Sequence, residues 1–210
     1  MRYSFCIALI FILIQSSIIP YSSSAQPLIS PVSHWISPYA AGATNEKTPC
    51  PILRSTFNVN GPVKNATVRI VGLGHYELFL NGKRVGTSLI NQPWSQYNKT
   101  IYWQEFDISK LLRNGENVWG VMLGNSFWHV TAANDTGRYV KTDAMPDFAS
   151  GYPYLLWLEA DLKLKDGAQQ IVTTDDSWKW QSGPLTFSHI YAGEDYDARR
   201  APAGWTTSGF

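Results

Sequence analysis

Residues 74–124 constrain the fold more strongly than any other part of this sequence. Within them, Asn81 and Gly82 follow a short run of strand-forming residues at 76–80. Both central residues of a type I′ turn need a positive φ, so an Asn-Gly pair at this place predicts a tight β-hairpin. The same stretch ends in the nearly continuous apolar run 117–123, which predicts a buried central strand. The stretch therefore indicates antiparallel β-structure.

The rest of the chain continues this pattern of short strands separated by turns. Residues 154–165 alternate apolar and polar side chains with period two, as a half-buried strand does. Asp107 is expected to cap one short helix over residues 108–113. Further strands are expected at residues 54–59, 66–71, 83–85, 100–106, 169–173, 185–191 and 196–199. The expected fold class is all-β, an antiparallel two-sheet jelly-roll sandwich with one short helical turn.

The first 25 residues are expected to be a secretory signal peptide. Arg2 supplies a positive charge, residues 7–14 form an unbroken apolar run, and small residues lead up to Ala25. The apolar run is shorter than the ~20 residues that a spanning helix needs, which disfavours the alternative of a membrane anchor. We expect cleavage near Ala25 and a secreted or periplasmic protein.

Four segments follow from this interpretation. Residues 1–25 are the signal peptide, and residues 26–51 are a proline-rich extended lead-in. Residues 52–200 are expected to form the β-sandwich. Residues 201–210 are expected to link it to a following domain.

Charge and cysteine content exclude several classes of function. The chain has 17 basic and 16 acidic residues, and removal of Arg2 with the signal leaves equal numbers of both. A neutral chain without blocks of like charge does not attract nucleic acid or an anionic membrane through its overall field, so neither is expected as a partner. Cys6 leaves with the signal peptide, so Cys50 has no disulfide partner. It is expected to be a semi-buried structural thiol.

Parts of this sequence resemble the galactose-binding-like jelly roll found at the N-terminus of several large glycosidases. The shared run is Tyr-Glu-Leu-Phe-Leu-Asn-Gly-Lys-Arg-Val-Gly at residues 76–86, followed by Phe-Asp-Ile at 106–108 and Gly-Glu-Asn at 115–117. Two later stretches narrow the resemblance. Val-Met-Leu-Gly-Asn-Ser-Phe-Trp at 121–128, and the segment 175–205 with its Gly-Glu-Asp-Tyr-Asp-Ala-Arg run, are similar to the N-terminal β-sandwich domain of bacterial α-L-rhamnosidases of glycoside hydrolase family 78.

This resemblance implies a part of an inverting glycosidase that releases terminal L-rhamnose from plant glycans. The catalytic acids of that family lie in a following (α/α)6 barrel, which these 210 residues cannot form. We therefore expect a non-catalytic accessory domain, without a cofactor, whose partners are rhamnose-containing glycans and the downstream catalytic domain. The alternatives are a free-standing carbohydrate-binding module and the sugar-binding domain of a β-galactosidase-type enzyme, and the ending at residues 195–199 argues against the latter.

Four side chains are candidates for carbohydrate contact, namely Trp94, Tyr97, Trp128 and His129. Trp128 and His129 lie in the long segment 124–153, which has no clear periodicity, as functional loops often do. An aromatic ring suits stacking on a sugar, and an imidazole suits hydrogen bonding to a hydroxyl. The alternative for Trp94 and Tyr97, which we favour, is that they cover one end of the sandwich.

An acidic cluster near the C-terminus contains Glu194, Asp195 and Asp197, followed by Arg199. Alternation along a strand would place Asp195 and Asp197 on one face, where they could form a carboxylate pair or a cation site. We favour the alternative that they bind turn amides or pair with Arg199 at a domain junction. No metal site is expected, because the four histidines lie far apart in the sequence.

Overall fold

The computed structural model describes residues 34–40, 42, 49–129, 151–190 and 193–210. The signal peptide predicted over residues 1–25 and most of the long loop predicted at 124–153 lie outside these ranges. Within them, no helix has both the length and the apolar character needed to cross a bilayer.

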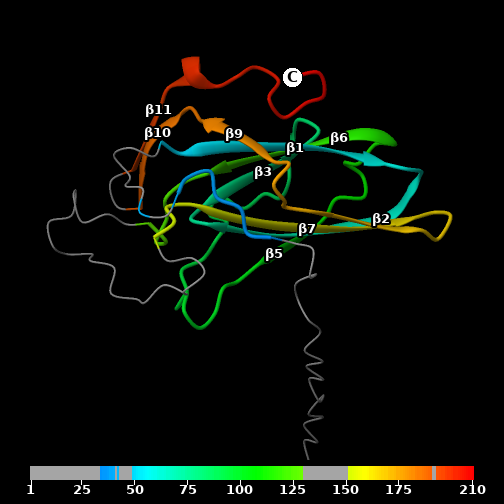
Figure 1. Cartoon of the computed structure of the whole chain (residues 1–210), viewed down its shortest axis with the longest axis horizontal. Helices are drawn as coiled ribbons and strands as arrows, with labels where there is room; N and C mark the ends of the chain where they lie inside the picture. Colours follow the sequence, from blue (N-terminus) through cyan, green and yellow to red (C-terminus); the bar gives the residue numbers. More distant parts are fainter. Residues whose placement is uncertain (1–33, 41, 43–48, 130–150, 191–192) are drawn as a thin grey trace, which may run out of the picture.

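The described residues form eleven strands, and every pairing between them is antiparallel. The strands are β1 (Pro51–Val59), β2 (Val63–Leu73), β3 (Tyr76–Leu80), β4 (Lys83–Arg84), β5 (Gln104–Asp107), β6 (Gly115–Leu123), β7 (Leu155–Leu164), β8 (Gln169–Thr173), β9 (Lys179–Ser182), β10 (Leu185–His189) and β11 (Gly193–Tyr196). A five-stranded sheet has the order β4-β3-β6-β1-β9, and a four-stranded sheet has the order β5-β2-β7-β8. The two sheets lie as layers, and β10 and β11 form a separate ribbon (Figure 1). The predicted all-β sandwich is confirmed.

The main core fills the space between the two layers. On β7, Leu156, Leu158 and Leu162 are fully buried, as the period-two pattern predicted. They face buried residues of β6 such as Val121 and Leu123. Burial of apolar area on this scale is the main favourable term in folding.

The hairpin predicted at Asn81 and Gly82 is confirmed, because their φ angles are 53° and 81°. The Asn81 side chain also ties the hairpin to its neighbours. Its Nδ2 donates to Asn117 Oδ1 (2.7 Å) and to Leu111 O (2.9 Å), and its Oδ1 accepts from Val118 N (3.0 Å). A buried amide whose hydrogen bonds are satisfied in this way fixes the position of β3 against β6.

The short helical turn predicted over residues 108–113 is limited to one hydrogen-bonded turn, in which Leu111 N donates to Ile108 O (2.9 Å). Asp107 does cap it, since its Oδ1 accepts from Ser109 N (2.8 Å) and Ser109 Oγ (2.6 Å). The next turn of helix does not form because the Asn117 side chain binds both Arg113 N (2.9 Å) and Arg113 O (2.8 Å). These bonds lead the chain directly into β6.

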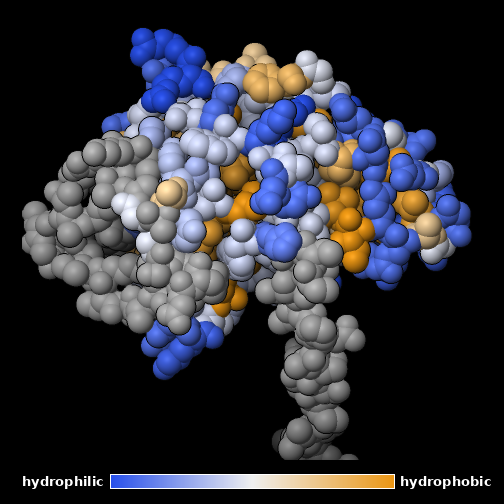
Figure 2. All heavy atoms as spheres, viewed as in Figure 1, coloured by the Kyte–Doolittle hydropathy of each residue, from blue (hydrophilic) through white to orange (hydrophobic). Residues whose placement is uncertain are grey.

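Three strand predictions need correction. The strand expected at 100–106 begins only at Gln104. Strand β9 was not predicted, although it forms the edge of the five-stranded sheet beside β1. The extended piece expected at 196–199 is instead the end of β11 followed by a 3-10 turn, Ala198–Arg200. That turn carries exposed arginines, and a strongly hydrophilic protrusion occupies the corresponding place in Figure 2.

Candidate functional site

One end of the outer face of the four-stranded sheet is covered by a second apolar cluster, which we call the aromatic plug. On this face β2 and β7 present apolar side chains to the outside of the sandwich. The plug contains Val71, Leu73, Tyr97, Trp128, Leu155 and Trp157, all of them buried. Trp128 is fully buried, its Nε1 donates to Tyr152 O (3.1 Å), and its ring meets that of Tyr97 edge-on at 5.1 Å. Neither ring therefore presents a stacking surface for a sugar.

The other two predicted sugar contacts lie in different surroundings. Trp94 is 62% exposed, and its ring stacks on Phe127 with 5.4 Å between the ring centroids. His129 is half-buried, its backbone N donates to Asn125 O (3.3 Å), and its ring lies 6.2 Å from that of Tyr154. Of the four candidates, only Trp94 keeps an exposed ring.

Within the acidic cluster, Asp197 is paired with Arg199. Both carboxylate oxygens of Asp197 accept from the Arg199 guanidinium, each at 2.8 Å. These hydrogen bonds lower the pKa of Asp197 below its usual value. Glu194 and Asp195 are exposed on β11. Where the structure describes side chains, no group of three or more histidine, cysteine or acidic residues is placed to hold a metal ion.

The outer face of the five-stranded sheet is different, because two rows of side chains cross it from strand to strand. Residues that are direct partners in neighbouring strands lie on the same face. The first row is Arg84, Phe79, Gly120, Arg54 and Lys179, in the order of the strands across the sheet. The second row is Glu77, Met122, Ile52 and Gln181.

Residues 201–210, which we call the tail, pass over this face near β1 and β6 (Figure 1). Gly120 makes room for them, because a Cβ there would lie 2.6 Å from Thr206 Cγ2 and 2.8 Å from Trp205 Cζ3. Arg54, the neighbour of Gly120 in the first row, binds the backbone of the tail. Its Nε donates to Trp205 O (3.1 Å) and its Nη2 donates to Thr207 O (3.2 Å). The segment predicted as a linker is thus seated on the sheet.

Trp205 separates two hollows on this face. The cationic hollow, of ≈ 320 Å³, is lined by Ile52, Arg54, Lys179, Gln181, Trp205 and Phe210. The acidic hollow, of ≈ 390 Å³, is lined among others by His75, Glu77, Phe79, Glu194, Tyr196 and Trp205. Sequence reasoning named only Glu194 among these residues. The missing information was the pairing of distant strands, which no local pattern reveals.

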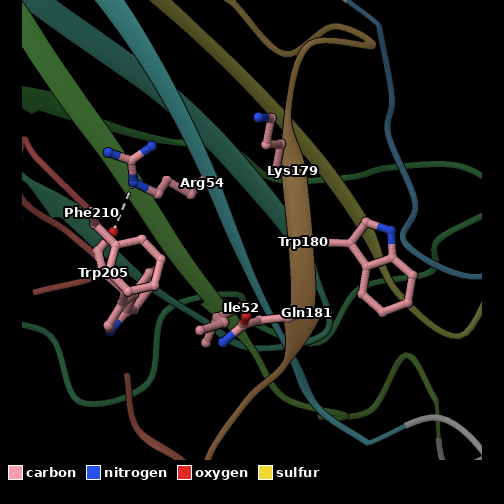
Figure 3. A pocket seen from close by; sticks show the side chains of 7 residues that line it. All are labelled: Ile52, Arg54, Lys179, Trp180, Gln181, Trp205 and Phe210. Atoms are coloured by element: carbon pink, nitrogen blue, oxygen red, sulfur yellow. Dashed lines mark hydrogen bonds between the residues drawn. The ribbon is translucent and has the colours of Figure 1, made fainter. Parts of the chain in front are cut away.

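In the cationic hollow, side chains of β1 and β9 lie opposite the rings of the tail. Figure 3 shows Ile52 and Gln181 beside Trp205 and Phe210, with the dashed bond from Arg54 to the tail. Trp180 also borders this hollow, but it extends from the other side of β9 (Figure 3). Its ring packs 5.0 Å from the ring of Tyr39.

The acidic hollow combines hydrogen-bonding groups with an exposed ring. Glu77 Oε1 pairs with Arg84 Nη2 at 3.2 Å, and Tyr196 is 59% exposed. Burial lowers the pKa of His75, so its imidazole is neutral at pH 7 and both donates and accepts. Its Nε2 is buried and has no hydrogen-bond partner among the described residues. Carboxylates, a neutral imidazole and an aromatic ring are the groups that bind sugar hydroxyls and sugar ring faces.

Comparison with known proteins identifies one family and several close relatives. The family described as the α-L-rhamnosidase N-terminal domain matches residues 61–210. An α-L-rhamnosidase of Formosa agariphila is 38% identical over 159 residues, which are 75% of this chain and 16% of that protein. An α-L-rhamnosidase of Streptomyces avermitilis is 30% identical over 159 residues and is covered to 14%. The chain thus spans about a sixth of the length of the curated relatives that it matches.

Solved structures of α-L-rhamnosidases also match this chain. The α-L-rhamnosidase from Dictyoglumus thermophilum superposes with a TM-score of 0.65 at 31% identity, over 77% of this chain and 16% of that one. The α-L-rhamnosidase of Streptomyces avermitilis, complexed with L-rhamnose, gives a TM-score of 0.66 at 28% identity, over 77% and 15%.

Proposed function

The chain belongs to the α-L-rhamnosidase N-terminal domain family, and from that premise we propose that it is the carbohydrate-contacting accessory domain of a secreted α-L-rhamnosidase-like glycosidase. In this proposal the parent enzyme acts on rhamnose-containing plant glycans, and this domain performs no hydrolysis by itself. The family match argues against the β-galactosidase-type alternative, which rested on the shared hairpin alone.

The acidic hollow is the observation that carries the carbohydrate part of this proposal. Its volume of ≈ 390 Å³ is within the range of small-molecule sites. Glu77 and Glu194 offer acceptors for sugar hydroxyls, and the exposed ring of Tyr196 offers an apolar face. Such a mixture of polar groups around one ring is suited to a neutral sugar.

The segment between β4 and β5 supports contact with the downstream catalytic domain. It exposes four large apolar side chains, which are Leu89, Ile90, Trp94 and Tyr102. Single exposed apolar residues are common, but several in one segment are typical of a surface that another domain covers. Trp94 would then serve the domain interface instead of a sugar.

The carboxylates of the hollow are poorly placed for catalysis. An inverting glycosidase needs one carboxylic acid kept protonated, and enzymes achieve this by apolar burial. Glu77 is instead ion-paired with Arg84 and half exposed, and Glu194 is exposed. Their surroundings favour binding over proton transfer.

The test is a titration of the purified chain with L-rhamnose, followed by NMR chemical shifts. Saturable shifts are expected around Tyr196, and Tyr196→Ala should weaken binding about tenfold, since a stacked ring contributes about 1 kcal/mol or more. Ile171→Ala is the matched control, because Ile171 is an exposed apolar residue on the other sheet.

Two results would contradict the proposal. One is L-rhamnose binding that Tyr196→Ala and Ile171→Ala affect equally. The other is release of rhamnose from an aryl rhamnoside by this chain above the background rate.

A further inference from the structure

We propose that the cationic hollow binds the carboxylate of an acidic sugar, that is, a uronic acid residue of a glycan. This inference rests on the proposed carbohydrate contact and adds a second, chemically different subsite. The two subsites lie on opposite sides of Trp205, which lines both hollows.

The first argument is that two positive charges lie side by side without a negative partner. Arg54 and Lys179 are direct partners across β1 and β9, so their side chains leave the same face of the sheet side by side. Like charges directly opposite each other in a sheet are destabilising. Within the described residues neither side chain forms an ion pair, and no side chain that lines the hollow is a carboxylate. An anionic ligand placed between the two cations would remove this repulsion.

The second argument is that Arg54 is held in place. Its Nε and Nη2 donate to the tail carbonyls of Trp205 and Thr207, and its guanidinium lies 5.8 Å from the centre of the Phe210 ring. No acceptor in the described part of the chain binds its Nη1. A guanidinium fixed on one side loses little freedom when it binds a carboxylate with the other, and such charge-assisted bonds are among the strongest in proteins.

The third argument concerns the rest of the hollow, which suits a sugar better than a bare ion. Phe210 is 59% exposed and offers a ring face, and Gln181 supplies an amide that can donate to and accept from hydroxyls. Ile52 lies between them as an apolar floor (Figure 3). A small inorganic anion would use the two cations and leave these groups without contact.

The experiment is an NMR titration of the full chain with D-galacturonate, with D-galactose as the uncharged match. Galacturonate should give saturable shifts at Lys179 and Gln181, and galactose should bind at least about tenfold more weakly, because it forms no charge-assisted bond. Raising NaCl from about 50 to about 500 mM should weaken galacturonate binding, since exposed charges are screened.

Lys179→Glu is the decisive variant. The Lys179 side chain is exposed and makes no hydrogen bond or ion pair in the described residues, so its replacement should leave the fold intact. It should weaken galacturonate binding about tenfold or more, and Lys179→Gln should weaken it about threefold. Lys163→Glu is the control, since Lys163 is an exposed strand lysine of the other sheet.

Three results would overturn the proposal. Galactose could bind as tightly as galacturonate, inorganic sulfate could compete as well as galacturonate does, or Lys179→Glu could behave like Lys163→Glu. L-Rhamnose titrated in parallel separates the two hypotheses. Rhamnose shifts at Tyr196 without galacturonate binding would refute the cationic subsite alone, whereas galacturonate binding without rhamnose shifts would refute only the rhamnose contact at the acidic hollow.

Discussion

The aromatic plug covers one end of the outer face of the four-stranded sheet, whereas the outer face of the five-stranded sheet is crossed by the tail and keeps two hollows. Tryptophan serves both faces. Trp128 is fully buried in the plug, and its Nε1 donates to the carbonyl of Tyr152. Trp205 lies between the two hollows, packed against Gly120. The difference arises from the strands beneath.

β2 and β7 present apolar side chains on both faces near one end, so that end needs a cover. The outer rows of the five-stranded sheet contain charged and amide side chains, such as Glu77, Arg54 and Gln181, which remain stable in contact with water. An abundance of aromatic residues therefore does not by itself indicate sugar binding. What matters is whether the ring lies over an apolar or a polar face.

The largest expected effect that tests this contrast comes from the plug. Trp128→Ala should lower the free energy of unfolding by about 3–5 kcal/mol, because it removes a fully buried aromatic ring and leaves a cavity. Urea denaturation followed by circular dichroism measures this.

Trp94→Ala is the matched control on the exposed side. It should cost about 1 kcal/mol, since that ring is mostly exposed and, among the described aromatic rings, stacks on that of Phe127. Equal losses for the two variants would mean that the plug is not a sealed cluster.

A second expected effect concerns the core that both faces enclose. The predicted structural thiol, Cys50, is buried, with its Sγ 3.3 Å from Tyr154 Oη. Burial raises the pKa of Cys50 from 9.0 to about 11. Because the folded state favours the protonated thiol, this contribution to stability is complete below pH 9 and is lost as the pH rises through 11. The free energy of unfolding should fall by about 2–3 kcal/mol over that range.

Urea titrations between pH 8 and 11 check the Cys50 effect, and Cys50→Ser separates it from the effects of tyrosines. Serine does not ionise in this range, so the variant should lose less stability with rising pH. An identical pH dependence in both proteins would show that Cys50 is not the responsible group.

The smallest expected effect on stability comes from the open face. Gly120→Val should displace the tail, because even a Cβ at this position would overlap Thr206 and Trp205. The loss should be only about 1 kcal/mol, since the tail can move outward to relieve the overlap. The NMR resonance of Arg54 Nε–H, which donates to Trp205 O, reports the displacement. Gly120→Ala should give a smaller shift of this resonance. An unchanged resonance in both variants would contradict the close packing of the tail on Gly120.

Local chemistry explains which features could be predicted from sequence. The positive φ required at Asn81 and Gly82 and the alternation along β7 are properties of consecutive residues, and both are confirmed. The helix expected after Asp107 stops after one turn because the Asn117 side chain takes the hydrogen bonds of Arg113. That contact depends on the later strand, so it could not be predicted from the residues of the turn.

The hollows could not be predicted for a similar reason. The cationic hollow depends on the register of β9 against β1, which sets Lys179 beside Arg54. The acidic hollow depends on the approach of β3, β11 and Trp205, which are also distant in the chain. β9 has four residues and no clear apolar pattern, and it gave no strand signal. Likewise, composition could not separate Trp94 from Trp128. The two loops meet, since Trp94 stacks on Phe127 and Tyr97 packs on Trp128, and only the depth at which each tryptophan ring is buried differs.

The bond between Arg54 and the tail has a consequence for how the domain is made. Its partners are 151 positions apart in the chain. A ribosome releases β1 early, long before its edge partner β9 and the residues that Arg54 will hold. Domains with such distant pairings fold slowly and only after most of their chain is available. The face with the two hollows is therefore completed later in synthesis than the rest of this sandwich.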